Sequence, residues 1–184
     1  MTLKAVEMTL NTLGCIAIRN AMHPKLRSWL LRLFGANVGI NVRIHSCRFM
    51  NFELGFKNLK FDDGVYIGTD VLIDCACTLN IGKNTTISAR SALITHSDPG
   101  TRQGNAIAKI YPARKTGVFI GNDCWIGVGA IVLDGSVIND RCLVAAGSVV
   151  TGSTLDKESL YAGSPAVFKK KLNFNSEKSS SHSL

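Results

Sequence analysis

The sequence contains four histidines, and the position of His96 is the one that favours proton-transfer chemistry. His96 lies immediately before an irregular stretch, residues 97–117 (SDPGTRQGNAIAKIYPARKTG), which has two prolines and three glycines. Long irregular segments inside a compact domain are usually functional or mobile. An imidazole titrates near pH 6.5 and can take the proton of a hydroxyl that attacks a carbonyl, which contributes about 10²–10⁴-fold to a rate. The other three, His23, His45 and His182, lie in the N-terminal region or the C-terminal tail.

Other side chains along the chain could support such chemistry, and each also has a purely structural interpretation. Asp98 is close in sequence to His96 and is a candidate to orient or contact a substrate, or it caps a turn. Arg102, within the irregular stretch, could bind a sugar or a phosphate, or it is simply solvated. Trp125 is one of two tryptophans and stands where a small residue or a turn former is expected. Residues 169–171 are three lysines that could bind phosphate or form a solubilising surface.

A six-residue period indicates the elements that position these residues. β-Branched aliphatic residues recur at every sixth position in the second half of the chain: Ile120, Ile126, Val132, Ile138, Val144 and Val150. Small residues stand four places after each of them: Cys124, Ala130, Ser136, Cys142, Ser148 and Thr154. Upstream, Phe61, Ile67 and Ile73 keep the same step, and a two-residue slip at Leu79-Asn80 resets the phase before Ile81, Ile87 and Leu93. Neither an α-helix, with a period of 3.6, nor a simple strand, with a period of 2, produces this pattern.

Each six-residue unit is expected to be one short strand plus a turn, with three units in a coil. Stacked coils place aliphatic residues inside a prism, small residues near its corners and parallel hydrogen-bond ladders between coils. We therefore expect an all-β domain over residues 36–163, with 97–117 as a protruding loop. Residues 1–35 are expected to be helical, with Pro24 in a first turn and Gly35 at a helix end. Residues 164–172 are expected to form a short basic helix, and the Ser-rich residues 173–184 a disordered tail.

Composition excludes several classes of protein. With 184 residues, 46% of them hydrophobic and 18% charged, the chain is expected to form one globular domain rather than a disordered or fibrous chain. No apolar run is long enough for a membrane span. The six cysteines form no CxxC pair, and no secretory signal precedes them, which favours free buried thiols and a cytoplasmic location.

The net charge of +8 is concentrated at the ends of the chain. Residues 1–60 carry nine basic and two acidic side chains, residues 61–164 carry eight and ten, and residues 165–184 carry four and one. This distribution indicates either solvated surface charge or ends that face an anion, such as a phosphate, a nucleotide or a lipid surface. Nucleic acid is not an expected partner because the basic residues are not interleaved with aromatic ones.

The segments IGNDCWIGVGAIVLDGSVINDRCLVAAGSVVT (120–151) and YAGSPAVFKKK (161–171) resemble the hexapeptide-repeat acyltransferases. The resemblance covers roughly residues 26–172 and is strongest to sugar and polysaccharide O-acetyltransferases such as the maltose and galactoside acetyltransferases. It implies a left-handed parallel β-helix, a homotrimer with active sites between subunits, and acetyl-CoA as the donor. No metal is expected.

The resemblance also implies roles for individual residues. His96 corresponds to the general base, and Asp74, Asp98 and Trp125 correspond to an acceptor-binding group, to which Arg102 is added as a loop candidate. Asp74 lies near the place of an Asn or Asp that binds acceptor hydroxyls in related enzymes, or it caps a turn. Trp125 also lines the donor cleft, where the backbone N–H groups around Gly127-Val128 are candidates to hold the oxyanion of the tetrahedral intermediate. The remaining positions implied for binding of CoA are Gly129, Ala146, Gly147, Thr151, Lys169 and Lys170. The segment TGSTLDKES (151–159) departs from the family pattern.

Several functions remain open at this stage. The acceptor could be a hydroxyl of a sugar or glycan in surface polysaccharide biosynthesis, possibly on a lipid-linked or phosphate-linked carrier with a peripheral membrane-surface contact. It could instead be the amine of an amino sugar, a serine hydroxyl or a xenobiotic. A metal hydratase of the carbonic anhydrase kind needs three histidines on the metal, and only His96 lies in the well-formed repeats. A non-catalytic β-helix scaffold is the last alternative.

Overall fold

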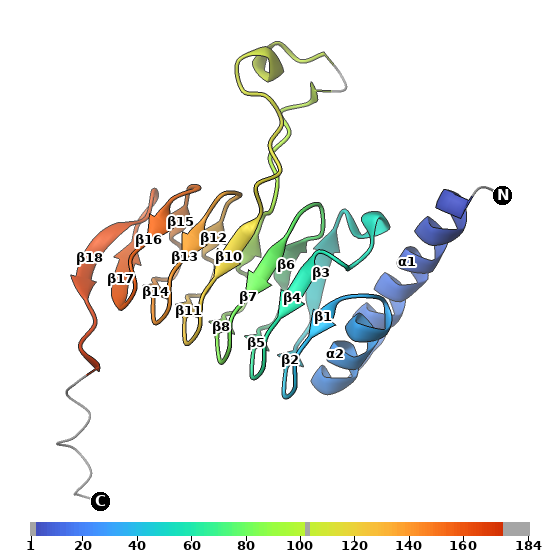
Figure 1. Cartoon of the computed structure of the whole chain (residues 1–184), viewed down its shortest axis with the longest axis horizontal. Helices are drawn as coiled ribbons and strands as arrows, with labels where there is room; N and C mark the ends of the chain where they lie inside the picture. Colours follow the sequence, from blue (N-terminus) through green and yellow to red (C-terminus); the bar gives the residue numbers. More distant parts are fainter. Residues whose placement is uncertain (1–2, 102–103, 175–184) are drawn as a thin grey trace, which may run out of the picture.

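The structure is a computed structural model that describes residues 3–101 and 104–174 (Figure 1). Two helices, α1 (Leu3–Asn20) and α2 (Pro24–Leu33), cover one end of a coiled array of short strands. Pro24 occupies the first turn of α2, and Gly35 follows its end with φ +97°, as the sequence predicts. The side chain of His23 accepts a hydrogen bond from the backbone N–H of Lys25, so this histidine has a capping role.

The strands form three sheets, one along each side of a prism. Sheet A consists of β1 (Asn37–Val38), β4 (Leu59–Phe61), β7 (Leu79–Ile81), β10 (Val118–Ile120), β13 (Val137–Ile138) and β16 (Thr154–Leu155). Sheet B consists of β2 (Arg43–Ile44), β5 (Tyr66–Ile67), β8 (Thr86–Ile87), β11 (Trp125–Ile126), β14 (Leu143–Val144), β17 (Ser159–Ala162) and β18 (Val167–Lys171). Sheet C consists of β3 (Cys47–Met50), β6 (Val71–Asp74), β9 (Ala92–Leu93), β12 (Ile131–Val132) and β15 (Val149–Val150).

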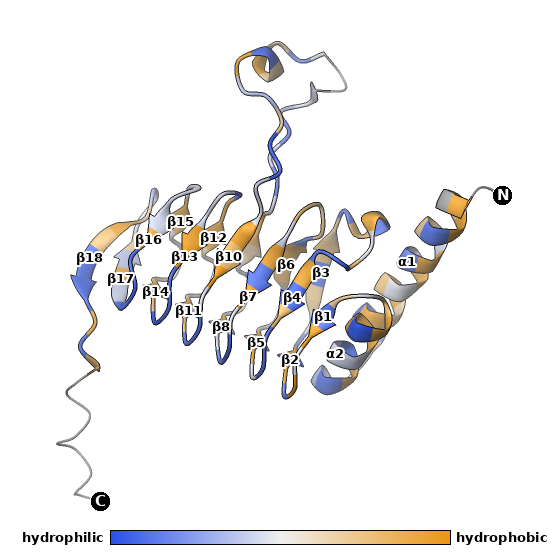
Figure 2. Ribbon diagram, in the orientation of Figure 1, coloured by the Kyte–Doolittle hydropathy of each residue, from blue (hydrophilic) through white to orange (hydrophobic). Residues whose placement is uncertain are grey.

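The six-residue period is confirmed as the basis of the core. In the two-residue strands the second residue points inward, so Ile126, Val132 and Val144 are fully buried. Figure 2 shows the matching pattern, with hydrophobic residues on the strands and hydrophilic ones at the turns along the lower edge. Neighbouring coils pair in parallel, and the chain folds as a left-handed parallel β-helix, as predicted.

The coils are regular except at the corner where the chain passes from sheet C to sheet A, here called the C–A corner. Ile120 pairs with Ile138, which matches three six-residue repeats. In earlier coils Val38 pairs with Phe61, Phe61 with Ile81, and Ile81 with Ile120, so each of these coils contains extra residues. The extra residues follow β3, β6 and β9 in turn. The two-residue slip and the irregular stretch 97–117 of the sequence therefore lie at one corner of the prism.

The expectation of a C-terminal helix over residues 164–172 is wrong. Residues 167–171 form β18, which pairs antiparallel with β17. Phe168 packs edge-on against Tyr161, with 5.9 Å between ring centroids. The hydrogen bonds available at the last exposed edge of sheet B outweigh the weak local preference of VFKKK for a helix. The disordered tail was expected over residues 173–184. Its first two residues are described, and the Phe174 ring lies 5.7 Å from the guanidinium carbon of Arg141, whereas residues 175–184 lie outside the described residues.

Two further observations bear on the expectations from composition. All six cysteines are free, with Cys15 and Cys77 half-buried and the other four buried. Burial raises the pKa of Cys47 and that of Cys124 to about 12, so both remain neutral thiols. Within residues 3–101 and 104–174, neither helix is both long and apolar enough to cross a membrane.

Candidate functional site

Three consecutive coils contribute one side chain each to a hydrogen-bonded row at the C–A corner. Asn51 follows β3, Asp74 ends β6, and His96 follows β9. The Asn51 amide donates to Oδ1 of Asp74 at 2.7 Å, and Nδ1 of His96 lies 2.6 Å from Oδ2 of the same carboxylate. The row exists because the extra residues of these coils stack above one another. Sequence reasoning found Asp74 and His96 but missed Asn51, whose only signal is its place in the first lengthened coil.

Asp74 is fully buried and holds five hydrogen bonds. Besides Asn51 and His96, its carboxylate accepts from the backbone N–H of Ala76 at 3.0 Å and from the backbone N–H and hydroxyl of Thr95, both at 2.9 Å. Burial by itself raises the pKa of this carboxyl group, but the hydrogen bonds from His96, Asn51, Ala76 and Thr95 outweigh it and hold the pKa below its ordinary value. Asp74 is therefore an ionised acceptor inside the protein.

This burial corrects the expectation that Asp74 binds the acceptor. A carboxylate without exposed surface cannot touch a substrate, and its oxygens already accept bonds from protein donors. What Asp74 does is fix the imidazole of His96, whose side chain remains 20% exposed. Because Nδ1 faces the carboxylate, the geometry favours the tautomer with hydrogen on Nδ1 and a lone pair on Nε2. Among the described residues, Nε2 has no hydrogen-bond partner.

The stretch after His96 is a protruding arm, residues 97–117, which leaves the upper edge of the β-helix in Figure 1. The outgoing and returning segments of the arm pair with each other at its base, where Ser97 and Arg114 exchange backbone hydrogen bonds. Arg114 also approaches the buried carboxylate of Asp134 at 3.7 Å. The arm ends in a short helical turn, η3 (Ala106–Lys109), and contains a pocket of about 610 Å³ lined in part by Asp98 and Tyr111.

Asp98 is exposed and caps a turn of this arm. Its Oδ1 accepts the backbone N–H groups of Gly100 and Thr101 at 2.9 and 2.8 Å. The hydrogen bonds from Thr101, followed by that from Gly100, lower the pKa of the Asp98 carboxyl group against a small opposing effect of burial. The structural interpretation of Asp98 as a turn cap thus accounts for its described contacts. Arg102 lies outside the described residues.

The positions expected to bind CoA gather at a different corner, where the chain passes from sheet B to sheet C (the B–C corner). Gly129 and Gly147 occupy stacked turns there with φ of +66° and +67°, and nothing lies near the place where a Cβ would stand. The equivalent turns of earlier coils hold Asp70 and Arg90 in the same backbone conformation. Glycine is therefore not needed for φ alone at this corner. Because glycine has no side chain, it leaves the backbone of these turns accessible to the close approach of a ligand.

Trp125 lies on the outer face of β11, which leads into the B–C corner. Its side chain is 53% exposed, and its Nε1 donates to the hydroxyl of Ser88 at 2.9 Å. The hydrogen bond holds one edge of the indole while its face remains open to solvent. A large exposed aromatic ring in a fixed orientation is a surface against which a ligand or a second protein can stack.

The expected site residues do not come together within one chain. His96 and Thr151 are at the C–A corner, whereas Val128, Gly129, Ala146 and Gly147 form the B–C corner; the sheet order places sheet C between them. Lys169 and Lys170 are exposed on β18, at the end of sheet B. In Figure 1 the arm leaves the upper edge of the prism, and β8, β11 and β14 lie along its lower edge. A second copy has to supply one of the two halves if they act on one substrate.

One expectation at the B–C corner needs correction. The backbone N–H of Gly127 donates to the carbonyl of Val144 at 2.8 Å, so it cannot also hold an oxyanion. Of the pair Gly127-Val128, only Val128 remains a candidate.

Gly127 and Gly129 provide a matched pair of substitutions. A Cβ on Gly127 would stand 2.5 Å from the backbone nitrogen of Ala146, and backbone atoms of the next coil cannot move away cheaply. We expect Gly127→Ala to lower the free energy of unfolding by about 3 kcal/mol or more, since the added Cβ meets backbone atoms rather than flexible side chains. In Gly129→Ala the added Cβ contacts nothing, so only the positive φ opposes the substitution. This strain lowers the free energy of unfolding by about 1–2 kcal/mol. Urea unfolding measures the loss of stability in both variants. A loss for Gly127→Ala that is equal to or smaller than that for Gly129→Ala would contradict the close packing of Gly127 against the next coil.

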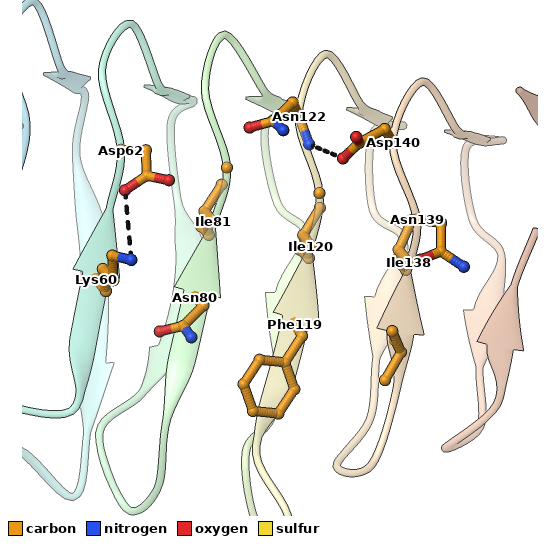
Figure 3. Close-up of a pocket in the computed structure, with 13 residues that line it drawn as sticks. Lys60, Asp62, Asn80, Ile81, Phe119, Ile120, Asn122, Ile138, Asn139 and Asp140 are labelled. Atoms are coloured by element: carbon orange, nitrogen blue, oxygen red, sulfur yellow. Dashed lines mark hydrogen bonds and ion pairs between the residues drawn. The ribbon is translucent and has the colours of Figure 1, made fainter. Parts of the chain in front are cut away.

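A further hollow of about 310 Å³ lies on the outer face of sheet A (Figure 3). Phe119 and Asn80 are neighbours there on β10 and β7, and Lys60 pairs with Asp62 at 3.8 Å beside them. None of the residues expected to be functional lies in it. Within the described part of the chain, no group of three His, Cys, Asp or Glu side chains is placed to hold a metal ion.

The chain was compared with known proteins. Residues 117–152 match the family model of the bacterial transferase hexapeptide (six repeats). WcaF of Escherichia coli strain K12, an acetyltransferase named for colanic acid biosynthesis, is 33% identical over 141 residues, which is 77% of this chain and 72% of WcaF. The galactoside O-acetyltransferase of Lactococcus lactis is 26% identical over 159 residues, or 86% of this chain and 74% of that protein.

Solved structures show the same fold. The hexapeptide-repeat acetyltransferase VCA0836 of Vibrio cholerae, complexed with acetyl coenzyme A, superposes with a TM-score of 0.77. The superposition covers 92% of this chain and 88% of the other, at 20% sequence identity. This agreement between distant sequences supports the β-helix and its coil arrangement.

Proposed function

Since the chain belongs to the hexapeptide-repeat acetyltransferase family, we propose that it transfers the acetyl group of acetyl-CoA to a hydroxyl of a sugar or glycan, with His96 as the general base. The observation that carries this proposal is the buried Asp74 carboxylate 2.6 Å from Nδ1 of His96, with Nε2 unpartnered among the described residues. The same arrangement of a carboxylate, an imidazole and an activated hydroxyl supports acyl transfer on unrelated folds. The names of WcaF and the galactoside O-acetyltransferase support a sugar-related acceptor.

The reaction follows from this geometry. Nε2 of His96 takes the proton of the acceptor hydroxyl while the oxygen bonds to the thioester carbon. The carbonyl oxygen becomes an oxyanion that the N–H of Val128 can stabilise. The intermediate then breaks its carbon–sulfur bond, and His96 returns the proton to the departing thiolate. Throughout, Asp74 holds the imidazole in one orientation and stabilises its transient positive charge.

We propose that each active site lies between two copies of a trimer. His96 comes from the C–A corner of one copy, and Trp125 with the bare backbone at Gly129 and Gly147 comes from the B–C corner of its neighbour. Sheet C, between these corners, presents half-buried apolar residues on its outer face: Leu72, Ala92, Ile131 and Val149. The exposed Arg48 of β3 lies beside Leu72 at one end of this row, so the apolar part of the face runs from β6 to β15. An apolar face of this kind is suited to an interface between copies. The phosphates of CoA would meet Lys169 and Lys170 on β18.

The acceptor class is tested by acetyl-CoA turnover, measured as release of free thiol, across a panel of compounds. The panel contains neutral sugars, amino sugars, and sugars on phosphate-linked or lipid-linked carriers. Because residues 1–60 are strongly basic, we expect phosphate-linked hydroxyl acceptors to be acetylated faster than free neutral sugars. Equal rates for phosphate-linked acceptors and free neutral sugars would overturn the expectation that the acceptor is linked to a carrier. Faster turnover of amino sugars would favour N-acetylation.

A further inference from the structure

The two N-terminal helices expose apolar side chains that no residue within 3–101 or 104–174 covers. Leu10, Leu13 and Ile16 of α1 and Trp29 and Leu33 of α2 are each more than half exposed. The residues that α1 turns toward the protein are different ones, since Asn11, Gly14 and Ile18 are buried. In the described chain α1 therefore has one inward face that packs and a second apolar face that has no partner.

The spacing of these residues aligns the exposed side chains in one row on each helix. Leu3, Val6, Leu10 and Leu13 follow the three- and four-residue steps that align side chains along one side of a helix. On α2, Leu26, Trp29 and Leu33 follow the same steps. We call these seven residues, together with Ile16, the N-terminal apolar face. Figure 1 places both helices at one end of the β-helix, beyond the first coil.

Basic side chains lie beside two residues of this face, Ile16 and Trp29. Residues 3–54 hold seven lysines and arginines against two glutamates. Arg19 at the end of α1 and Arg48 on β3 line a crevice of about 260 Å³, whose other walls include Ile16 and Phe52. On the far side, Lys25 and Arg32 flank Trp29 in a second hollow of about 240 Å³. Both hollows thus combine an apolar wall with a pair of cations.

We propose that the N-terminal apolar face binds the surface of an anionic phospholipid membrane, with α1 and α2 lying in the plane of the interface. Amphipathic helices bind there by burying an apolar face among the acyl chains while cations meet the headgroup phosphates. Tryptophan favours this boundary, which suits the exposed Trp29. A soluble protein partner would not require the excess of positive charge that borders the face. The inference is independent of the proposed acetyl transfer, since it involves neither acetyl-CoA nor an acceptor and its test measures no turnover.

Flotation of the full chain with lipid vesicles tests the proposal without any activity measurement. We expect binding to vesicles that contain phosphatidylglycerol, and weak binding to vesicles of phosphatidylcholine alone. Raising the salt concentration should weaken the binding because it screens the cations. Equal binding to both lipids, or to neither, overturns the proposal.

A matched pair of variants locates the binding face. Ile16 and Ile107 are each 52% exposed, but Ile107 lies in the arm, far from the helices. We expect Leu13→Ser with Ile16→Ser to reduce vesicle binding by about tenfold or more. Ile107→Ser with Ile110→Ser should leave it unchanged. Circular dichroism and the mass of the assembly are measured in parallel. A helix-face variant that keeps full vesicle binding, or that loses only its assembly, contradicts the proposal and identifies the face as a contact between copies.

Trp29 supplies a spectroscopic readout of the same event. Trp125 is the other tryptophan, so a Trp125→Phe chain reports fluorescence from Trp29 alone. We expect the emission to shift to shorter wavelength on addition of anionic vesicles, because the indole leaves water for the interface. An unchanged spectrum under conditions where the protein floats with the vesicles would exclude α2 from the contact.

Discussion

His96→Ala is expected to lower kcat for acetyl transfer by about 10²–10⁴-fold, because the acceptor hydroxyl then loses its general base. The imidazole stands 20% exposed at the edge of the β-helix, so its removal leaves the core of the coils unchanged. The mass of the assembly and the Kd for CoA should therefore stay close to those of the wild type. Thiol release at saturating acetyl-CoA measures kcat, and isothermal titration measures binding of CoA.

His45→Ala is the matched control. His45 also follows a strand of the β-helix, but it lies at the B–C corner of the first coil, three strands of sheet B before Trp125. Its ring packs against Tyr66, with 5.1 Å between centroids. We expect the kcat of the His45→Ala variant to remain within a few-fold of the wild-type value. Near-normal turnover by His96→Ala would remove the proposed mechanism, and an equal loss in both variants would indicate a general defect of the fold.

Asp74→Asn is expected to have the largest combined effect on stability and turnover. The carboxylate accepts five hydrogen bonds in a fully buried position, and an amide nitrogen there would face donors instead of accepting from them. Leaving such donors unpaired costs about 3–5 kcal/mol of unfolding free energy. kcat should also fall by about 10²–10⁴-fold, because nothing then fixes the tautomer and orientation of His96. The KM for acetyl-CoA should change little, since Asp74 is fully buried and makes no contact with a substrate.

The pH dependence of stability provides an independent check on Asp74. The pKa of this carboxyl group is lower in the folded chain than its ordinary value of about 3.9. Its stabilising contribution is therefore fully present above pH of about 3.9 and is lost as the pH falls through the native pKa. The difference in unfolding free energy between the wild type and Asp74→Asn should be constant near neutral pH and shrink in acid. A difference that grows as the pH falls would contradict the ionised, hydrogen-bonded state of Asp74.

The regular part of the fold follows directly from the sequence. A β-branched residue at every sixth position can bury its side chain only if the chain turns after each short strand, so Ile120 to Val150 predict the prism by themselves. The conformation of residues 167–171 cannot be predicted from the local sequence, because VFKKK forms a strand only where the open edge of sheet B offers hydrogen bonds. That edge exists only after all the preceding coils have stacked.

The site is only partly predictable, for a related reason. The break in the repeat before residue 97 points to His96, and the slip near Leu79-Asn80 marks the lengthened coil that contains Asp74. The sequence does not reveal that the extra residues of three coils stack at one corner. Their stacking changes the role expected for Asp74, from contact with an acceptor to orientation of His96, and brings Asn51 into the row. The burial of a carboxylate depends on these long-range contacts.

Mixing two inactive variants tests most directly whether two copies share each active site. His96→Ala chains keep an intact B–C corner, and Ala146→Trp chains, whose exposed Ala146 is replaced by a bulky ring in that corner, keep His96. In trimers co-expressed in equal amounts, about a quarter of the interfaces would combine both intact halves. We predict that the mixture recovers about a quarter of wild-type thiol release although each variant alone is inactive. A mixture as inactive as its components would show that catalysis is completed within a single chain and would contradict the shared site.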